Sequence, residues 1–114
     1  MLYKKLNDIN LNSFLDECMH RKFIITDDGV LRLGRASQHR DLLEWGEDCT
    51  CGGGFWRVDD GRGLVMLYGR SFNFGAPVIG RVRCVEWVGV PVLELPVFYL
   101  AEWPRDGVMI PVIY

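Results

Sequence analysis

Residues 49–75, CTCGGGFWRVDDGRGLVMLYGRSFNFG, carry the clearest structural signal in the chain. Two apolar runs flank an Asp-Asp-Gly-Arg-Gly turn, which predicts a β-hairpin with strands at 55–58 and 64–68. A glycine-rich loop precedes the first strand and another follows the second, so antiparallel pairing should bring both loops to one end of the hairpin. Such loops can aim backbone N–H groups at a ligand, which makes this end the predicted functional site. Its glycines are Gly52, Gly53, Gly54, Gly69 and Gly75.

The length and composition of the chain limit its architecture and its partners. With 114 residues, 49% of them hydrophobic, it is predicted to form one domain, 1–114, around a single core. A net charge of −2 provides no basic field, so neither nucleic acid nor a membrane is an expected partner. Charged residues and prolines interrupt the apolar runs, which argues against a transmembrane helix. The polar N-terminus does not resemble a secretory signal, and a cytoplasmic location is expected.

The four cysteines are expected to be reduced thiols in that compartment. Cys49 and Cys51 are separated by one residue, whereas a zinc knuckle uses a two-residue spacing. With only two histidines and two distant cysteines besides, a tetrahedral metal site is not predicted. No metal or other cofactor is expected.

Two helices are predicted. In residues 10–22 the apolar side chains recur with helical spacing, Asn10 is a suitable N-cap, and the last turn is basic. Ser37 is the expected cap of a second, shorter helix that reaches Trp45, with Gly46 at its C-terminal end. The apolar stripe of the first helix consists of Leu11, Phe14, Leu15, Cys18 and Met19.

Strand signals fill most of the remaining chain. Residues 23–26 and 30–33 are predicted strands joined by an Asp-Asp-Gly turn. Val78–Tyr114 is rich in β-branched and aromatic residues and is interrupted by prolines, which indicates edge strands or bulges, with a turn at 104–107. Together the elements predict a single-domain α+β fold: two helices packed on a mainly antiparallel mixed sheet, with a β-rich C-terminal third.

A series of short motifs runs from Asp28 to Pro77. It consists of Asp28-Gly29-Val30, a strand cation at Arg32, His39-Arg40-Asp41-Leu42, Cys49-Thr50-Cys51, Gly52-Gly53-Gly54 and Tyr68-Gly69-Arg70-Ser71-Phe72-Asn73-Phe74-Gly75-Ala76-Pro77. In its order, and in the distance from the glycine triplet to Tyr68-Gly69, this part of the chain resembles the protein phosphohistidine phosphatase family, also called Janus/Ocnus.

The resemblance covers less than half of the chain and has clear departures. Arg32 stands where the family has a lysine, and Ala76-Pro77 reverses the family's Pro-Ala. One residue is missing before the glycine triplet, and the segments on either side of His39 are shorter. Val78–Tyr114 does not resemble the family's closing helix and strand. Because one fold can host different functions, the resemblance bears more on structure than on activity.

The resemblance implies a metal-independent phosphatase. In that family a histidine acts as general base toward a bound phosphohistidine, while backbone amides and a cation hold the phosphoryl group. Carried onto this chain, His39 is the catalytic residue, and the substrate-binding residues are Arg32, Ser71, Phe72 and Asn73. The first turn of a helix favours neutral imidazole at His39, and a guanidinium can hold phosphate through two hydrogen bonds. Phosphoryl transfer depends mainly on such positioning and charge stabilisation.

Each of these residues also has a structural interpretation. His39 can be an exposed helix residue, and Arg32 can be a solvated cation on a strand face. Ser71 and Asn73 are ordinary turn formers. The glycine triplet can serve close packing of backbones, at an entropic cost.

Two functions from different classes therefore remain open. The first is a phosphohistidine or phosphoramidate phosphatase-like hydrolase, or a phosphate-binding protein, whose ligand is a phosphorylated protein or a small phosphoryl compound. The second is a non-enzymatic interaction module that acts as a homodimer, adaptor or inhibitor through the apolar strands of Val78–Tyr114. Two observations discriminate between them: the position of the His39 ring relative to the Ser71–Asn73 amides, and the oligomeric state.

Overall fold

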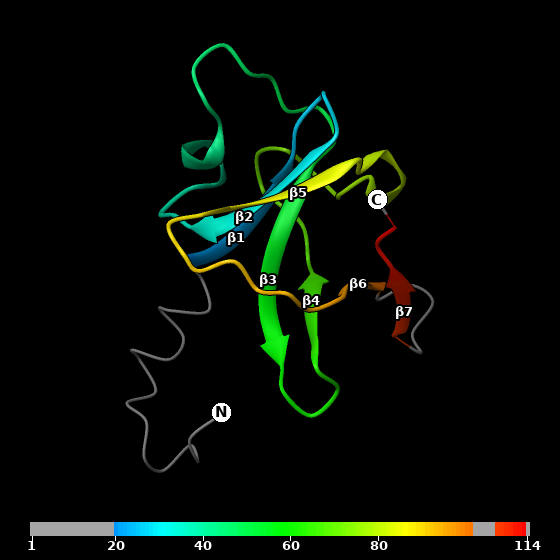
Figure 1. The fold of residues 1–114 in the computed structure, drawn as a ribbon. Coiled ribbons are helices and arrows are strands. Elements are labelled where there is room, and N and C mark those ends of the chain that lie inside the picture. Colours follow the sequence, from blue (N-terminus) through cyan, green and yellow to red (C-terminus); the bar gives the residue numbers. More distant parts are fainter. Residues whose placement is uncertain (1–19, 102–106, 114) are drawn as a thin grey trace.

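The computed structural model describes residues 20–101 and 107–113, and these residues form one seven-stranded mixed sheet (Figure 1). The strands lie side by side in the order β5-β2-β1-β3-β4-β6-β7. Their bounds are β1 Arg21–Ile25, β2 Val30–Arg35, β3 Gly53–Asp59, β4 Leu64–Tyr68, β5 Cys84–Val88, β6 Val97–Ala101 and β7 Val108–Pro111. Two 3₁₀ turns, η2 His39–Leu42 and η3 Ile79–Arg81, lie in the connections.

Two hairpins form the middle of the sheet. Strands β1 and β2 pair antiparallel around the turn at 27–29, and β3 and β4 pair antiparallel with Phe55 opposite Tyr68. Both hairpins were predicted from their turn residues, and the structure confirms them. The outer strands are added differently: β5 runs parallel to β2, β6 runs parallel to β4, and β7 closes antiparallel on β6.

The sheet is curled, and one of its faces carries the hydrophobic core. In Figure 1, β1, β2 and β5 run across the view while β3 and β4 run down it. Trp56 on β3 packs edge-to-face on Trp87 of β5, with ring centroids 5.2 Å apart. The segment between β5 and β6 packs its apolar side chains against the same cluster. The buried core residues are Phe23, Ile25, Leu31, Leu33, Cys51, Trp56, Val65, Leu67, Val82, Val97 and Val112.

The opposite face carries buried polar groups. Because side chains alternate along a strand, Phe23 and Ile25 facing the core place Lys22 on the other side of β1. Arg32 shares this second face, because it pairs with Ile24, and Phe55 shares it because it pairs with Lys22. The connection between β2 and β3 contributes η2, whose His39 and Leu42 are both buried. The buried polar side chains predicted to act in the site therefore lie away from the main core.

The predicted fold class of two helices packed on a sheet is wrong. Most of the described residues are in strands or loops, and no α-helix of seven or more residues lies within the described ranges. The helix expected from Ser37 to Trp45 is only the four-residue 3₁₀ turn η2, capped by Gln38 and followed by extended backbone at Leu43. Too few apolar residues lie in this segment to form a helical stripe, so tertiary contacts decide its conformation.

The other predicted helix, at 10–22, lies mostly outside the described residues. Its last two residues, Arg21 and Lys22, belong to β1 and pair with Arg35 and Gly34 of β2. The predicted turn at 104–107 also lies mostly outside the described part. In the described ranges, no helix has the length and apolar character needed to cross a bilayer.

Candidate functional site

His39 lies over the glycine-rich start of β3. Its side chain is buried, and its Nε2 lies 2.7 Å from the carbonyl oxygen of Gly54. The ring meets Phe55 edge-to-face, with centroids 5.2 Å apart, and its Cδ2 lies against Gly53, where a Cβ would come within 3.4 Å. The structural alternative of an exposed helix residue is therefore wrong, because His39 is fixed on the sheet.

The surroundings of His39 determine its protonation. Burial lowers the pKa of His39, and the nearby Lys22 charge lowers it further, while the bond to Gly54 partly opposes both effects. Because a carbonyl oxygen only accepts hydrogen bonds, Nε2 carries the hydrogen and donates it to Gly54. Near neutral pH the ring is therefore uncharged, and Nδ1 holds a lone pair.

The Nδ1 atom of His39 is in part exposed to solvent, although the residue as a whole is only 8% exposed. This atom makes no hydrogen bond with the residues that the structure describes, and no fully buried side-chain nitrogen or oxygen among them lacks a partner. An unpartnered Nδ1 must then be accessible to water. The ring is thus held by one nitrogen and available through the other, which is the arrangement that a general base requires.

Lys22 is a residue of this site that the sequence did not indicate. It was assigned to the end of a helix, but it lies on β1, opposite Phe55 and on the same face as the His39 ring. Lys22 is a buried residue, its ammonium donates to the carbonyl of Ala36 at 2.8 Å, and burial lowers the pKa of Lys22. Only knowledge of the β1–β3 register could have placed this cation beside His39.

The two glycine loops meet at one end of the hairpin, as predicted. The Ser71 amide donates to the carbonyl of Gly53 at 2.8 Å, and the Gly53 amide donates to the carbonyl of Gly75 at 3.2 Å. Gly53 therefore contacts both the His39 ring and the Ser71 turn. The structure therefore brings two predicted site elements, His39 and the Ser71 turn, into contact with the same residue.

Within the turn, the three predicted binding residues differ in their surroundings. Ser71 is buried, and its hydroxyl oxygen accepts a hydrogen bond from the Phe74 amide at 3.1 Å, so this oxygen shapes the turn. Phe72 and Asn73 are exposed at the tip. Neither of their backbone N–H groups makes a hydrogen bond within the described chain, which leaves two donors for a ligand. A hollow of about 190 Å³ adjoins the turn, lined by Gly69, Arg70, Ala76 and Tyr99.

The glycine triplet is required for close packing of backbones. A Cβ on Gly54 would come within 2.6 Å of the Tyr68 carbonyl oxygen, and one on Gly53 would collide with the Phe23 carbonyl oxygen. Gly52 has a φ of +81° and lies against the backbone of Ala76. The absence of side chains allows His39 and the Ser71 turn to approach the same stretch of β3.

Arg32 does not lie free beside the Ser71 turn. Its guanidinium is 3% exposed and donates to Glu86 at 2.8 Å, to the Leu42 carbonyl at 2.9 Å and to both carboxylate oxygens of Glu47. The bonds to Glu47 are the main reason that the pKa of Arg32 is raised. Because the guanidinium is already committed to two carboxylates, its predicted contact with phosphate is disfavoured in this structure.

The thiols of the site region are held within the protein. Cys49 is half-buried and its Sγ donates to the Ile25 carbonyl at 3.2 Å, while Cys51 belongs to the core. Burial raises the pKa of Cys49, which disfavours a reactive thiolate. Over the described ranges, no group of three or more His, Cys, Asp or Glu side chains is placed to hold a metal ion.

Comparisons with protein-family models, with curated proteins and with solved structures give no match to this chain. The proposals below therefore rest on the geometry of the site and on the motif resemblance.

Proposed function

We propose that the chain is a phosphatase-like hydrolase that acts on phosphohistidine or a related phosphoramidate, with His39 as its general base. The observation that carries this proposal is the state of the His39 ring. The imidazole is neutral, its Nε2–H is held by the Gly54 carbonyl, and its Nδ1 is open to solvent. This resembles what a histidine base needs for proton abstraction at neutral pH.

In the proposed reaction, Nδ1 of His39 takes a proton from the attacking water as the water oxygen bonds to phosphorus. The P–N bond breaks, and its electron pair stays on the departing nitrogen, which takes up the proton that His39 removed from the water. The backbone N–H groups of Phe72 and Asn73 are available to hold the phosphoryl oxygens. Lys22 replaces Arg32 in this proposal as the positive charge that acts on His39.

The test is hydrolysis of a phosphohistidine peptide or phosphoramidate by the full chain, compared with His39→Ala. Loss of a general base is expected to lower turnover by about 100-fold or more. The chain's only other histidine supplies the matched control, since His20→Ala should retain turnover. Absence of turnover in the folded native protein, or equal turnover in His39→Ala, would overturn the proposal.

A cytoplasmic location remains part of the proposal. Cys49, Cys51 and Cys84 are free cysteines in the structure, and unpaired thiols suit a reducing compartment.

A second candidate function is a protein-interaction module, and exposed aromatic side chains favour it. Trp45 and Phe72 are both fully exposed, each on a loop, whereas large aromatic side chains are normally at least partly covered. On the edge strand β7 and just beyond it, Val108, Ile110 and Ile113 are exposed as well. The outer edge of β7 includes Pro111, which has no N–H to donate, so strand addition there is disfavoured. Trp45 is therefore the better anchor for a protein partner.

A further inference from the structure

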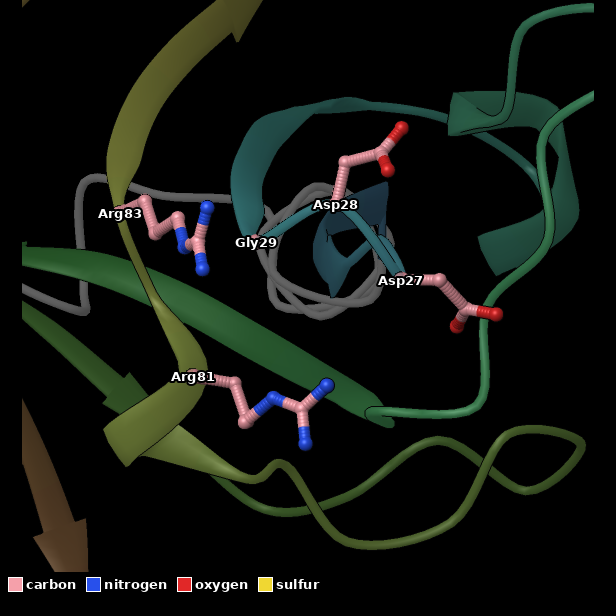
Figure 2. Close-up of a pocket in the computed structure, with 5 residues that line it drawn as sticks. All are labelled: Asp27, Asp28, Gly29, Arg81 and Arg83. Carbon is pink, nitrogen blue, oxygen red and sulfur yellow. The ribbon is translucent and has the colours of Figure 1, made fainter.

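The turn between β1 and β2 and the segment that leads into β5 enclose a second pocket, which shares no residue with the His39 site. The pocket has a volume of about 330 Å³ and is lined by Asp27, Asp28, Gly29, Arg81 and Arg83. Figure 2 shows the Arg83 side chain extending toward Gly29, and the Arg81 side chain extending below the turn, toward the side on which Asp27 lies. From this pocket we propose a binding site for a phosphate monoester, held between Arg81 and Arg83.

Both arginines are exposed next to a buried residue. Val82, between them, is buried in the core, whereas Arg81 and Arg83 face solvent. The Arg81 amide donates to the Val78 carbonyl at 3.1 Å, and the Arg83 amide donates to the Gly29 carbonyl at 2.7 Å. This short segment is therefore tied to the turn of the β1–β2 hairpin, which fixes the backbone positions from which the two charged side chains extend.

Gly29 makes room for the arginine stem. Its φ is +88°, and a Cβ there would come within 2.9 Å of the Arg83 Cγ and 2.7 Å of the Arg81 carbonyl oxygen. Only glycine meets both conditions, a left-handed backbone and a close approach. The aliphatic part of Arg83 thus lies directly against the turn.

The two aspartates offset the charge of the arginines only in part, through the Coulombic attraction between Asp27 and Arg81. Among the residues that the structure describes, neither Arg81 nor Arg83 makes a hydrogen bond or an ion pair through its guanidinium, and Figure 2 shows the Asp27 and Asp28 carboxylates pointing away from them. Asp27 is occupied elsewhere, because it accepts hydrogen bonds from the Thr50 amide at 2.6 Å and from the Thr50 hydroxyl at 2.8 Å. These bonds, with a smaller contribution from the Arg81 charge, hold the pKa of Asp27 below its usual range.

The donors in the pocket match a phosphate group. Two guanidinium groups can each donate two parallel hydrogen bonds and together balance the two negative charges of a monoester. The Asp28 backbone N–H, at the tip of the turn, also makes no hydrogen bond within the described chain. A single carboxylate offers one charge and two oxygens, and it would leave part of this donor set unused.

The experiment is an NMR and calorimetric titration of the full chain with phenyl phosphate, with acetate as the carboxylate comparison. Saturable binding of phenyl phosphate, with shifts at Asp28, Gly29 and Arg83, supports the site. Arg81→Gln and Arg83→Gln should each weaken binding by about tenfold or more, the loss expected for a charge-assisted hydrogen bond. Arg62→Gln, at the exposed tip of the other hairpin, removes the same charge and should leave binding unchanged. Binding that does not saturate, that acetate equals, or that survives both variants overturns the proposal.

Two further arms separate the possible sources of the ligand and the two proposed sites. Inorganic phosphate and a phosphoserine peptide are titrated in parallel: tighter binding of the peptide assigns the site to phosphorylated protein, and equal binding assigns it to small phosphates. His39→Ala should bind phenyl phosphate at this pocket as the native chain does. Failure of the His39 hydrolase proposal would therefore leave this site standing, and the reverse also holds.

Discussion

Arg32 and His39 lie on the same face of the sheet, and both were predicted to act on a phosphoryl group, but their bonding differs. Arg32 is surrounded by acceptors from two segments, Leu42 and Glu47 in the β2–β3 connection and Glu86 on β5. His39 has one nitrogen bonded to the Gly54 carbonyl and the other open to water. A buried polar side chain whose hydrogen bonds are all made within the protein stabilises the fold. One that keeps an unbonded donor or acceptor atom can interact with a ligand. The predictions below test this difference.

The largest effect on stability is expected at Arg32. Arg32→Met removes the guanidinium and leaves the Leu42 carbonyl and the Glu47 carboxylate without their donor, which should cost about 2–3 kcal/mol of the free energy of unfolding. Urea denaturation monitored by tryptophan fluorescence measures it. Glu44→Gln is the matched control, because Glu44 lies 3.9 Å from the guanidinium and is mostly exposed. An Arg32→Met protein as stable as the native one would show that the cluster does not hold the fold.

A smaller effect, visible as pH dependence, is expected at His39. The pKa of His39 is lowered in the folded protein, so the unfolded chain binds its proton more readily. The contribution of neutral His39 is therefore fully present above the unfolded pKa of about 6.5 and is lost as the pH falls below it. Each pH unit costs at most about 1.4 kcal/mol until the folded pKa is reached.

The measurement is the free energy of unfolding of the native chain and of His39→Gln between pH 7.5 and pH 5. Their difference should shrink as the pH falls, because glutamine does not titrate. A constant difference would mean that the ring keeps its ordinary pKa when folded, and the argument for a neutral base would fail. The same titration followed by NMR at the ring C–H protons gives the folded pKa directly.

The sequence predicted local structure well and non-local structure poorly, for physical reasons. Both central hairpins follow from residues close together in the chain, such as the Asp-Asp-Gly turn at 27–29. The predicted helix at 37–45 is not formed, because the few apolar residues there do not make a helical stripe. The Leu42 carbonyl instead accepts a hydrogen bond from Arg32. Arg32 binds residues 15 and 54 positions away, Glu47 and Glu86, and no local pattern encodes such pairings.

In the candidate site too, features set by local sequence were predicted, and features set by non-local strand pairing were not. The approach of the two glycine loops follows from antiparallel pairing alone, and it was correctly expected. Lys22 could not be found, because its position beside His39 depends on the register of β1 against β3. The pocket at Arg81 and Arg83 depends on a parallel β2–β5 pairing between strands distant in the chain. Its two arginines belonged to no motif.

The smallest effect on stability is expected at Trp45, and this prediction links Arg32 to the second candidate function. The guanidinium of Arg32 holds the Leu42 carbonyl and the Glu47 carboxylate, which are the two ends of the loop that exposes Trp45. Trp45→Ala removes no described contact of the fold and should change the free energy of unfolding by less than about 0.5 kcal/mol.

If the chain self-associates through this aromatic side chain, sedimentation velocity at rising concentration should show a dimer that Trp45→Ala abolishes. Arg32→Met, studied where it is still folded, should weaken the same dimer, because the loop loses both of its anchors and must be ordered on binding. Arg62→Gln, at the far end of the other hairpin, should not. A dimer insensitive to Trp45 would place the interface elsewhere, and a monomer at every concentration would exclude the homodimer. In either case Arg32 would hold the loop, and the open nitrogen of His39 would be the stronger indication of function.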